Sequence, residues 1–149
     1  MSLILNIETS TTNCSVSISE DEEIIESQEK DFENYSHSEV LHVYINELFR
    51  KSDLKIGDIS AVSISQGPGS YTGLRIGSAT AKGICFALKI PLIAIDTMHI
   101  LAKKIKLKKG YIIPNLDAGR NEIYFSVFDY NYQKIQPTNF KELKIKSFE

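Results

Sequence analysis

Residues 63–83 read SISQGPGSYTGLRIGSATAKG, and this stretch decides the interpretation of the rest of the chain. Its five glycines stand at positions 67, 69, 73, 77 and 83. A glycine in a helix interior costs about 1 kcal/mol relative to alanine, yet the pattern from Thr72 to Leu88 is otherwise helical. The glycines therefore indicate one of three features, which are a phosphate-binding loop, a close-packed interface or a sharp turn.

The two common glycine-rich phosphate motifs do not fit this stretch. A P-loop needs four residues between its glycines and a lysine after the second one. Here five residues separate Gly67 from Gly73, and Leu74 and Arg75 follow. A dinucleotide fingerprint would need a glycine where Thr72 stands. Both interpretations fail on spacing.

The geometry that remains is a strand, a turn and a helix. Gly67 and Gly69 flank Pro68, which lets the chain turn sharply after the strand. The first N–H groups of the following helix are then free, with Ser70 and Thr72 beside them. These hydroxyls either cap the helix or help it bind an anion, and we favour capping.

The later glycines form a stripe of small residues. Gly73, Gly77 and Ala81 are four residues apart and share one helix face, Ser78 adjoins them, and Gly83 continues the series. Such a stripe lets another backbone approach closely, and the van der Waals contact offsets the lost helix propensity. The sequence leaves open whether the neighbour belongs to the same chain or to another, and packing within the chain is the commoner case.

The rest of the chain predicts an α/β layer fold. Strand patterns lie at 3–8, 14–19, 24–30, 59–65 and 90–95, and helix patterns at 36–50, 72–88 and 97–104. A second meander without helices follows at 111–117, 122–129 and 132–137, and the tail from Asn139 is too short to assign. This order predicts a mixed sheet with packed helices, residues 1–105 forming one lobe and residues 106–149 part of a second lobe.

Two helices have identifiable starts. The first carries an apolar stripe of Leu41, Tyr44, Ile45 and Leu48. Ser36 is its expected N-cap, with Glu39 completing a capping box. Asp96 or Thr97 is expected to cap the third helix.

Composition indicates a cytoplasmic protein with an ordinary core. The chain has 149 residues, 42% of them hydrophobic, and a net charge of −2, which gives no overall attraction to nucleic acid or anionic membrane. It shows no secretory leader and no apolar run near the ~18 residues that span a bilayer. Cys14 and Cys85 are expected to be buried thiols in a reducing compartment.

Four segments together resemble the TsaB (YeaZ) family. They are ILNIETSTTNCSVSI (4–18), YSHSEVLHVYINELF (35–49), ISQGPGSYTGLRIGSATAKG (64–83) and NLDAGRNEIYFSVFD (115–129). They occur in family order and span nearly the whole chain. The resemblance implies the actin-like ATPase (ribonuclease H-like) fold with two similar lobes, of which the second is truncated here. Whether this short lobe is natural or the chain is a fragment is left open.

The resemblance also implies a function. The family is a paralogue of the catalytic TsaD subunit and acts in making threonylcarbamoyladenosine beside the anticodon of transfer RNA. TsaB binds and activates TsaD alongside the small ATPase TsaE, and it pairs with itself when alone. The implied role is therefore a non-catalytic partner subunit without a cofactor, which meets transfer RNA only through the complex.

The family's partner surface lies on the first two helices of the N-terminal lobe. The residues expected there are Tyr44, Leu48, Phe49, Gly73, Leu74, Arg75, Gly77, Ser78 and Ala81. Tyr and Arg are typical interface anchors, although core packing explains Tyr44 and Phe49 equally well.

A phosphate site is the weaker expectation. In the superfamily a β-turn-β with an acid and hydroxyls handles phosphate. The corresponding residues here are Glu8, Thr9, Ser10, Thr11, Gly69, Ser70 and Thr72. A hairpin turn rich in hydroxyls explains the first four equally well.

No metal site is expected. The catalytic paralogue binds metal through two histidines one helical turn apart, whereas His37 and His42 are five residues, about 140°, apart around a helix. His99 is isolated. The run KKIKLKK at 103–109 has five lysines that either contact RNA phosphates or form a solvated helix end, and we favour the second.

Two alternative functions stay open. One is a stand-alone nucleotide-binding enzyme, an ATPase or transferase, working through Glu8 and the loop from Gly67 to Thr72. The other is a self-associating module outside any nucleic-acid pathway. A protease is disfavoured because no cysteine or serine pairs with a histidine at a known motif spacing, and no HExxH is present.

Overall fold

A computed structural model describes residues 2–31 and 37–144, which divide into two compact units. Unit 1 comprises residues up to Gln66 together with Ser70–Ile95, and unit 2 comprises Gly67–Gly69 and the chain from Asp96 onward. None of the described helices is long and apolar enough to cross a membrane.

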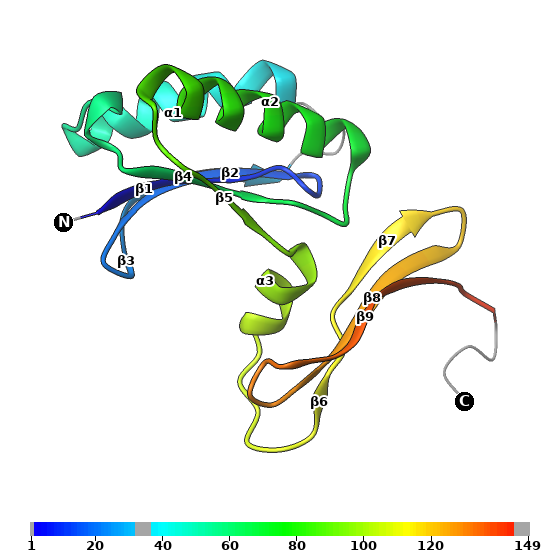
Figure 1. Ribbon diagram of the computed structural model, residues 1–149. Helices are drawn as coiled ribbons and strands as arrows, with labels where there is room; N and C mark the ends of the chain where they lie inside the picture. Colours follow the sequence, from blue (N-terminus) through cyan, green and yellow to red (C-terminus); the bar gives the residue numbers. More distant parts are fainter. Residues whose placement is uncertain (1, 32–36, 145–149) are drawn as a thin grey trace. The chain divides into compact units, whose positions relative to one another are not determined.

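Unit 1 is a five-stranded mixed sheet covered by two helices. Its elements are β1 (Leu3–Glu8), β2 (Asn13–Glu20), β3 (Glu23–Asp31), α1 (His37–Ser52), a short 3-10 turn (Ile56–Asp58), β4 (Ala61–Ser65), α2 (Tyr71–Leu88) and β5 (Leu92–Ile95). The strand order is β3-β2-β1-β4-β5. The first three strands form the expected antiparallel meander, whereas β4 and β5 run parallel to β1. Figure 1 shows α1 and α2 on one face of this sheet.

The alternation in β1 and β2 separates a buried apolar face from a face of short polar side chains. Leu5 and Ile7 point towards the helices and are buried, together with alternate residues of β2 and the inner stripe of α1. On the opposite face, the Asn6 side chain accepts a hydrogen bond from Ser63 Oγ (2.6 Å). It also donates to Ser17 Oγ (3.2 Å) and Ser19 Oγ (3.1 Å). These short polar side chains thus satisfy one another across β2, β1 and β4.

The glycine-rich stretch forms the predicted strand, turn and helix. Ser70 caps α2, since its side chain accepts from Gly73 N at 3.1 Å. The expected N-cap of α1, Ser36, lies outside the described residues, so its capping box is not described.

The stripe of small residues on α2 packs against the chain's own β1–β2 turn. A Cβ atom added to Gly73 would overlap the carbonyl oxygen of Thr9, and one added to Gly77 would overlap the Thr9 hydroxyl. Ala81, the third residue of the stripe, is fully buried in the apolar core of unit 1. This settles the question that the sequence left open, because the close neighbour is within the chain.

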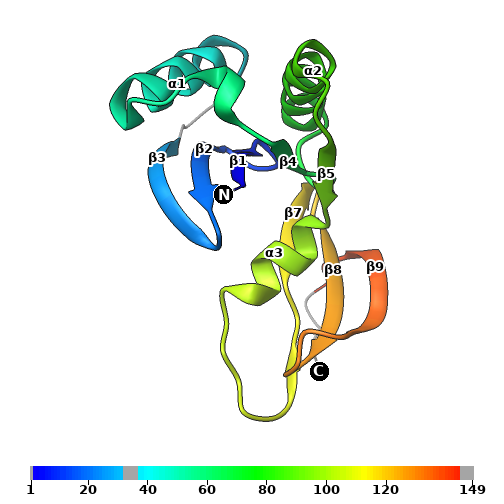
Figure 2. The ribbon, with the colours of Figure 1, turned by 60° about the vertical axis from the view of Figure 1, so that its left-hand side comes forward.

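Unit 2 consists of a short helix and a four-stranded antiparallel sheet (Figure 2). Its elements are α3 (Thr97–Lys103), β6 (Tyr111–Ile112), β7 (Asn115–Gly119), β8 (Glu122–Asp129) and β9 (Lys134–Glu142). β9 includes part of the tail that the sequence left unassigned.

The third helix belongs to unit 2, which moves the expected boundary from residue 105 to residue 95. The reason is apolar packing, because Met98 and Ala102 of α3 are fully buried in one cluster with Ile112 and Phe128. Asp96 caps α3 by accepting from Met98 N (2.7 Å) and also pairs with Lys134. Partial burial raises the pKa of its carboxyl, but the hydrogen bonds and the Lys134 charge outweigh this and leave the pKa below its ordinary value.

We expect Gly73→Ala and Gly83→Ala, two identical substitutions on one helix, to change stability in opposite directions. Gly73→Ala should lower the free energy of unfolding by about 1–3 kcal/mol, because the new methyl group meets the Thr9 backbone. Gly83 has open space around it, so Gly83→Ala should raise stability by up to about 1 kcal/mol through helix propensity. Urea unfolding of both variants measures the difference, and equal effects would contradict the packing described here.

Candidate functional site

Glu8 and Ser65 come together where two parallel strands end. Glu8 is the last residue of β1 and Ser65 the last of β4, and the register pairs Ile7 with Ile64 just before them. Ser65 Oγ donates to Glu8 Oε1 at 2.7 Å. The same oxygen accepts from Ser10 N at 2.7 Å. The carboxylate is therefore held by two donors at the carboxyl edge of the sheet, where α/β folds commonly place ligands.

The turn after β1 is bonded directly to the start of α2. Ser70 N donates to Ser10 O at 2.6 Å, and Thr9 Oγ1 donates to Gly73 O at 2.8 Å. Thr11 Oγ1 accepts from Asn13 N at 3.2 Å. The Thr9 hydroxyl thus joins this turn to α2, whereas the Thr11 hydroxyl bonds within the turn and the Ser70 hydroxyl caps α2.

The structure brings five of the seven expected phosphate residues together, namely Glu8, Thr9, Ser10, Thr11 and Ser70. Thr72 is exposed on the first turn of α2, and Gly69 belongs to unit 2. Of this group, only Ser10 Oγ is buried without a hydrogen-bond partner among the described residues. Ser65 was not expected from the sequence, and its only signal was its position at the end of a buried strand.

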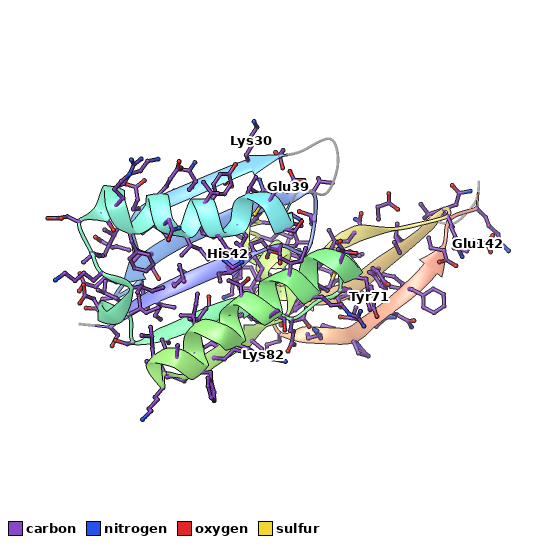
Figure 3. The ribbon with its side chains drawn as sticks, turned by 90° about the horizontal axis from the view of Figure 1, so that it is seen from above. Lys30, Glu39, His42, Tyr71, Lys82 and Glu142 are labelled. Carbon is purple, nitrogen blue, oxygen red and sulfur yellow. The ribbon has the colours of Figure 1, made fainter. Side chains whose placement is uncertain are left out.

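The two histidines of α1 lie in different surroundings. His37 is buried, with Nε2 2.8 Å from Thr11 O. His42 is exposed and lies on the side of α1 that faces α2 (Figure 3). Within residues 2–31 and 37–144, no three His, Cys, Asp or Glu side chains are grouped as metal ligands would be.

The two cysteine thiols are buried, as expected. Burial raises the pKa of Cys14 to about 11 and also raises the pKa of Cys85. Since a thiolate is the reactive form, both thiols are poor nucleophiles at neutral pH.

The nine residues expected at a partner interface separate into two groups. Leu48, Tyr44 and Phe49 are core residues with at most 9% of their surface exposed. Gly73, Gly77 and Ala81 face the chain's own interior, which corrects the expectation that this stripe itself meets a partner. The three that remain towards solvent are Leu74, Arg75 and Ser78.

A shallow groove of about 490 Å³ lies beside that stripe, between α1 and α2. We call it the α1–α2 groove, and its lining includes His42 and Asn46 from α1 and Ala79, Thr80 and Gly83 from α2. At the N-terminal end of α2, the Arg75 guanidinium lies 4.0 Å from the centre of the exposed Tyr71 ring. The sequence missed the groove because it depends on how two helices lie side by side.

Residues 25–142 match the family model described as TsaD, tRNA N6-adenosine threonylcarbamoyltransferase. The tRNA threonylcarbamoyladenosine biosynthesis protein TsaB of Buchnera aphidicola subsp. Acyrthosiphon pisum is 31% identical over 89% of this chain and 60% of its own length. TsaB of Bacillus subtilis is 30% identical over 85% of this chain and 55% of its own length. The chain thus spans little more than half of these relatives.

The solved structure of YeaZ from Pseudomonas aeruginosa shares the fold, with a TM-score of 0.84 and 22% identity over 98% of this chain and 71% of that one. The mixed sheet, its helices and the second, shorter sheet are therefore those of the actin-like (ribonuclease H-like) fold, as the sequence implied. On the family model and the relatives together, this chain belongs to the TsaD family and, within it, to the TsaB (YeaZ) group.

Proposed function

We propose that the chain acts in the biosynthesis of threonylcarbamoyladenosine in transfer RNA, as the non-catalytic partner of a TsaD-type catalytic subunit. Family membership supports the pathway. The observation that carries the partner role is the α1–α2 groove, an open surface between two well-packed helices. By contrast, the hydroxyls near Glu8 are largely bonded within the chain.

The α1–α2 groove has the features of a surface for helix docking. Ala79, Thr80 and Gly83 are small, so a partner helix can approach the α2 backbone closely. Ile45, Ile56 and Ile84 supply apolar contact around them. The docking surface expected from the sequence is thus kept on α1 and α2 but moves from the buried stripe to the neighbouring face of α2.

The exposed pair of Tyr71 and Arg75 adds an anchor beside the groove. The cation–π contact holds both side chains on the surface, and Tyr and Arg are among the residues that most often dominate interface energies. We include Leu74 and Ser78 in the same surface because they lie on α2 and are only half-buried.

The remaining parts of the proposal concern partners. In this proposal the catalytic subunit brings the transfer RNA, a TsaE-type ATPase joins through the complex, and the chain acts in the cytoplasm. When the catalytic subunit is missing, we infer that two copies of this chain pair through the α1–α2 groove. No membrane partner is part of this proposal.

We expect Ala79→Arg to weaken binding to the TsaD-type subunit of the same organism at least 10-fold. Ala79 is exposed in the α1–α2 groove, so the long charged side chain should block the partner without disturbing the fold. Ala87→Arg is the matched control, because Ala87 is also exposed on α2 but lies outside the groove lining. Titration calorimetry measures both affinities, and urea unfolding checks both folds.

Two results would count against the proposal. Absence of any wild-type complex at micromolar concentration would contradict the partner role itself. Equal loss of binding in both variants, or in neither, would show that the partner contacts another surface.

A second experiment addresses the stand-alone nucleotide enzyme. We expect no ATP–Mg²⁺ binding at micromolar concentration, and we expect Glu8→Ala to lower the free energy of unfolding by about 1–3 kcal/mol. The reason is that Ser10 N and Ser65 Oγ would lose their shared acceptor. Glu29→Ala, an exposed acid on β3, should leave stability unchanged. Tight ATP binding that Glu8→Ala abolishes would instead support the enzyme.

A further inference from the structure

Unit 2 carries an apolar groove of about 360 Å³ that has no part in the proposed function. Its lining includes Leu101 of α3, Ile105 and Leu107 of the following segment, and Tyr111 and Ile113 around β6. Tyr111 is 66% exposed and Ile113 56% exposed. A cluster of large apolar side chains left in water in this way marks an interaction site.

The segment that supplies Ile105 and Leu107 to this groove is rich in lysine, and we call the groove the lysine-rimmed groove. Between Lys103 and Lys109 five of seven residues are lysine, and all five are exposed. Lys104, Lys106 and Lys108 alternate with the lining residues Ile105 and Leu107. The ion pairs seen among the described residues use other lysines, Lys134 and Lys144. The occupant that fits is therefore an apolar segment flanked by carboxylates.

The chain contains such a segment in its other unit. Residues 1–95 hold seven basic and thirteen acidic residues, a net charge of −6, whereas residues 96–149 hold ten and six, a net charge of +4. The acidic excess includes an unbroken run of four carboxylates at residues 20–23, followed directly by Ile24 and Ile25. The net charge of −2 conceals this separation of charge.

The β2–β3 hairpin presents that segment at its tip. Asp21 and Glu22 form a two-residue turn, both with positive φ (44° and 78°), and the register places Glu20 opposite Glu23. The register shifts near Ile18 and Ser19, which leaves Ile24 66% and Ile25 42% exposed. Since β3 is an edge strand of its sheet, a neighbouring molecule can reach this tip.

We propose that the β2–β3 hairpin tip of one copy of this chain docks into the lysine-rimmed groove of a second copy. Ile24 and Ile25 contact the apolar lining, while the carboxylates of residues 20–23 lie against Lys104, Lys106 and Lys108. The tip combines exposed isoleucines with an acidic run, and the groove combines an apolar lining with neighbouring lysines. The contact uses neither α1 nor α2, so it does not rest on the proposed function.

The expected association is modest and depends on salt. Exposed ion pairs each contribute little and are screened as ionic strength rises. The dissociation constant, measured by sedimentation equilibrium, should therefore increase at least 10-fold between 50 and 500 mM NaCl. All proteins in the test carry Ala79→Arg, so that pairing through the α1–α2 groove does not contribute.

Charge reversal tests the contact directly. One variant reverses the groove (Lys106→Glu with Lys108→Glu), and another reverses the tip (Glu22→Lys with Glu23→Lys). Each alone should lose self-association. An equimolar mixture should form a mixed complex, because the acidic tip of the first fits the basic groove of the second. A variant with all four changes has the wild-type net charge and should associate with itself again.

Two variants that leave the net charge unchanged test the apolar part of the proposed contact. Ile24→Ser and Ile113→Ser should each weaken association several-fold without moving the unfolding midpoint, because both residues are exposed. A monomeric protein at 200 µM in low salt would overturn the proposal, as would reversed variants that fail to recombine. If Lys106→Glu with Lys108→Glu abolishes the binding of transfer RNA but leaves self-association unchanged, the lysines serve nucleic acid and the proposal is wrong.

Discussion

The arrangement of unit 1 depends on the contact between Thr9 and the first turns of α2. The hydroxyl of Thr9 donates to Gly73 O, and the Ser10 carbonyl accepts from Ser70 N, so the β1–β2 turn is tied to the helix by two hydrogen bonds. Gly73 and Gly77 face Thr9 so closely that a side chain at either position would overlap it. A buried hydroxyl in such a contact must keep its partner, because an unsatisfied polar group costs about 1–3 kcal/mol. The contact therefore fixes where α2 lies on the sheet, and with it the position of the α1–α2 groove.

Local patterns predicted most of the elements, whereas contacts between distant residues escaped prediction. The alternation in β2 and the apolar stripe of α1 gave these elements nearly to their ends, because period and face are local properties. The stripe from Gly73 to Ala81 was recognised, but its neighbour Thr9 lies more than sixty residues away. Ser65 was missed for the same reason, since its partner Glu8 is brought near only by the parallel pairing of β1 and β4.

The boundary between the two units shows how packing decides what periodicity leaves open. α3 follows β5 in the sequence, which favours including it in the first lobe. Its buried residues Met98 and Ala102, however, share a cluster with Phe128, and burial of a side chain as large as Met or Phe provides about 1.5–3 kcal/mol. Overall charge was equally uninformative, because the acidic and basic halves of the chain nearly cancel. The fold adds that this division of charge along the sequence coincides with the division into two units.

The face of the five-stranded sheet that lies opposite the helices combines two kinds of surface. At its centre the Asn6 side chain is hydrogen-bonded to three serines, Ser17, Ser19 and Ser63. At its β5 edge Ile93 and Ile95, paired in register with Ser63 and Ser65, are 40% and 37% exposed. Covering this face would therefore bury apolar side chains at the edge without leaving the central Asn6 amide unsatisfied, because its partners lie in the same sheet.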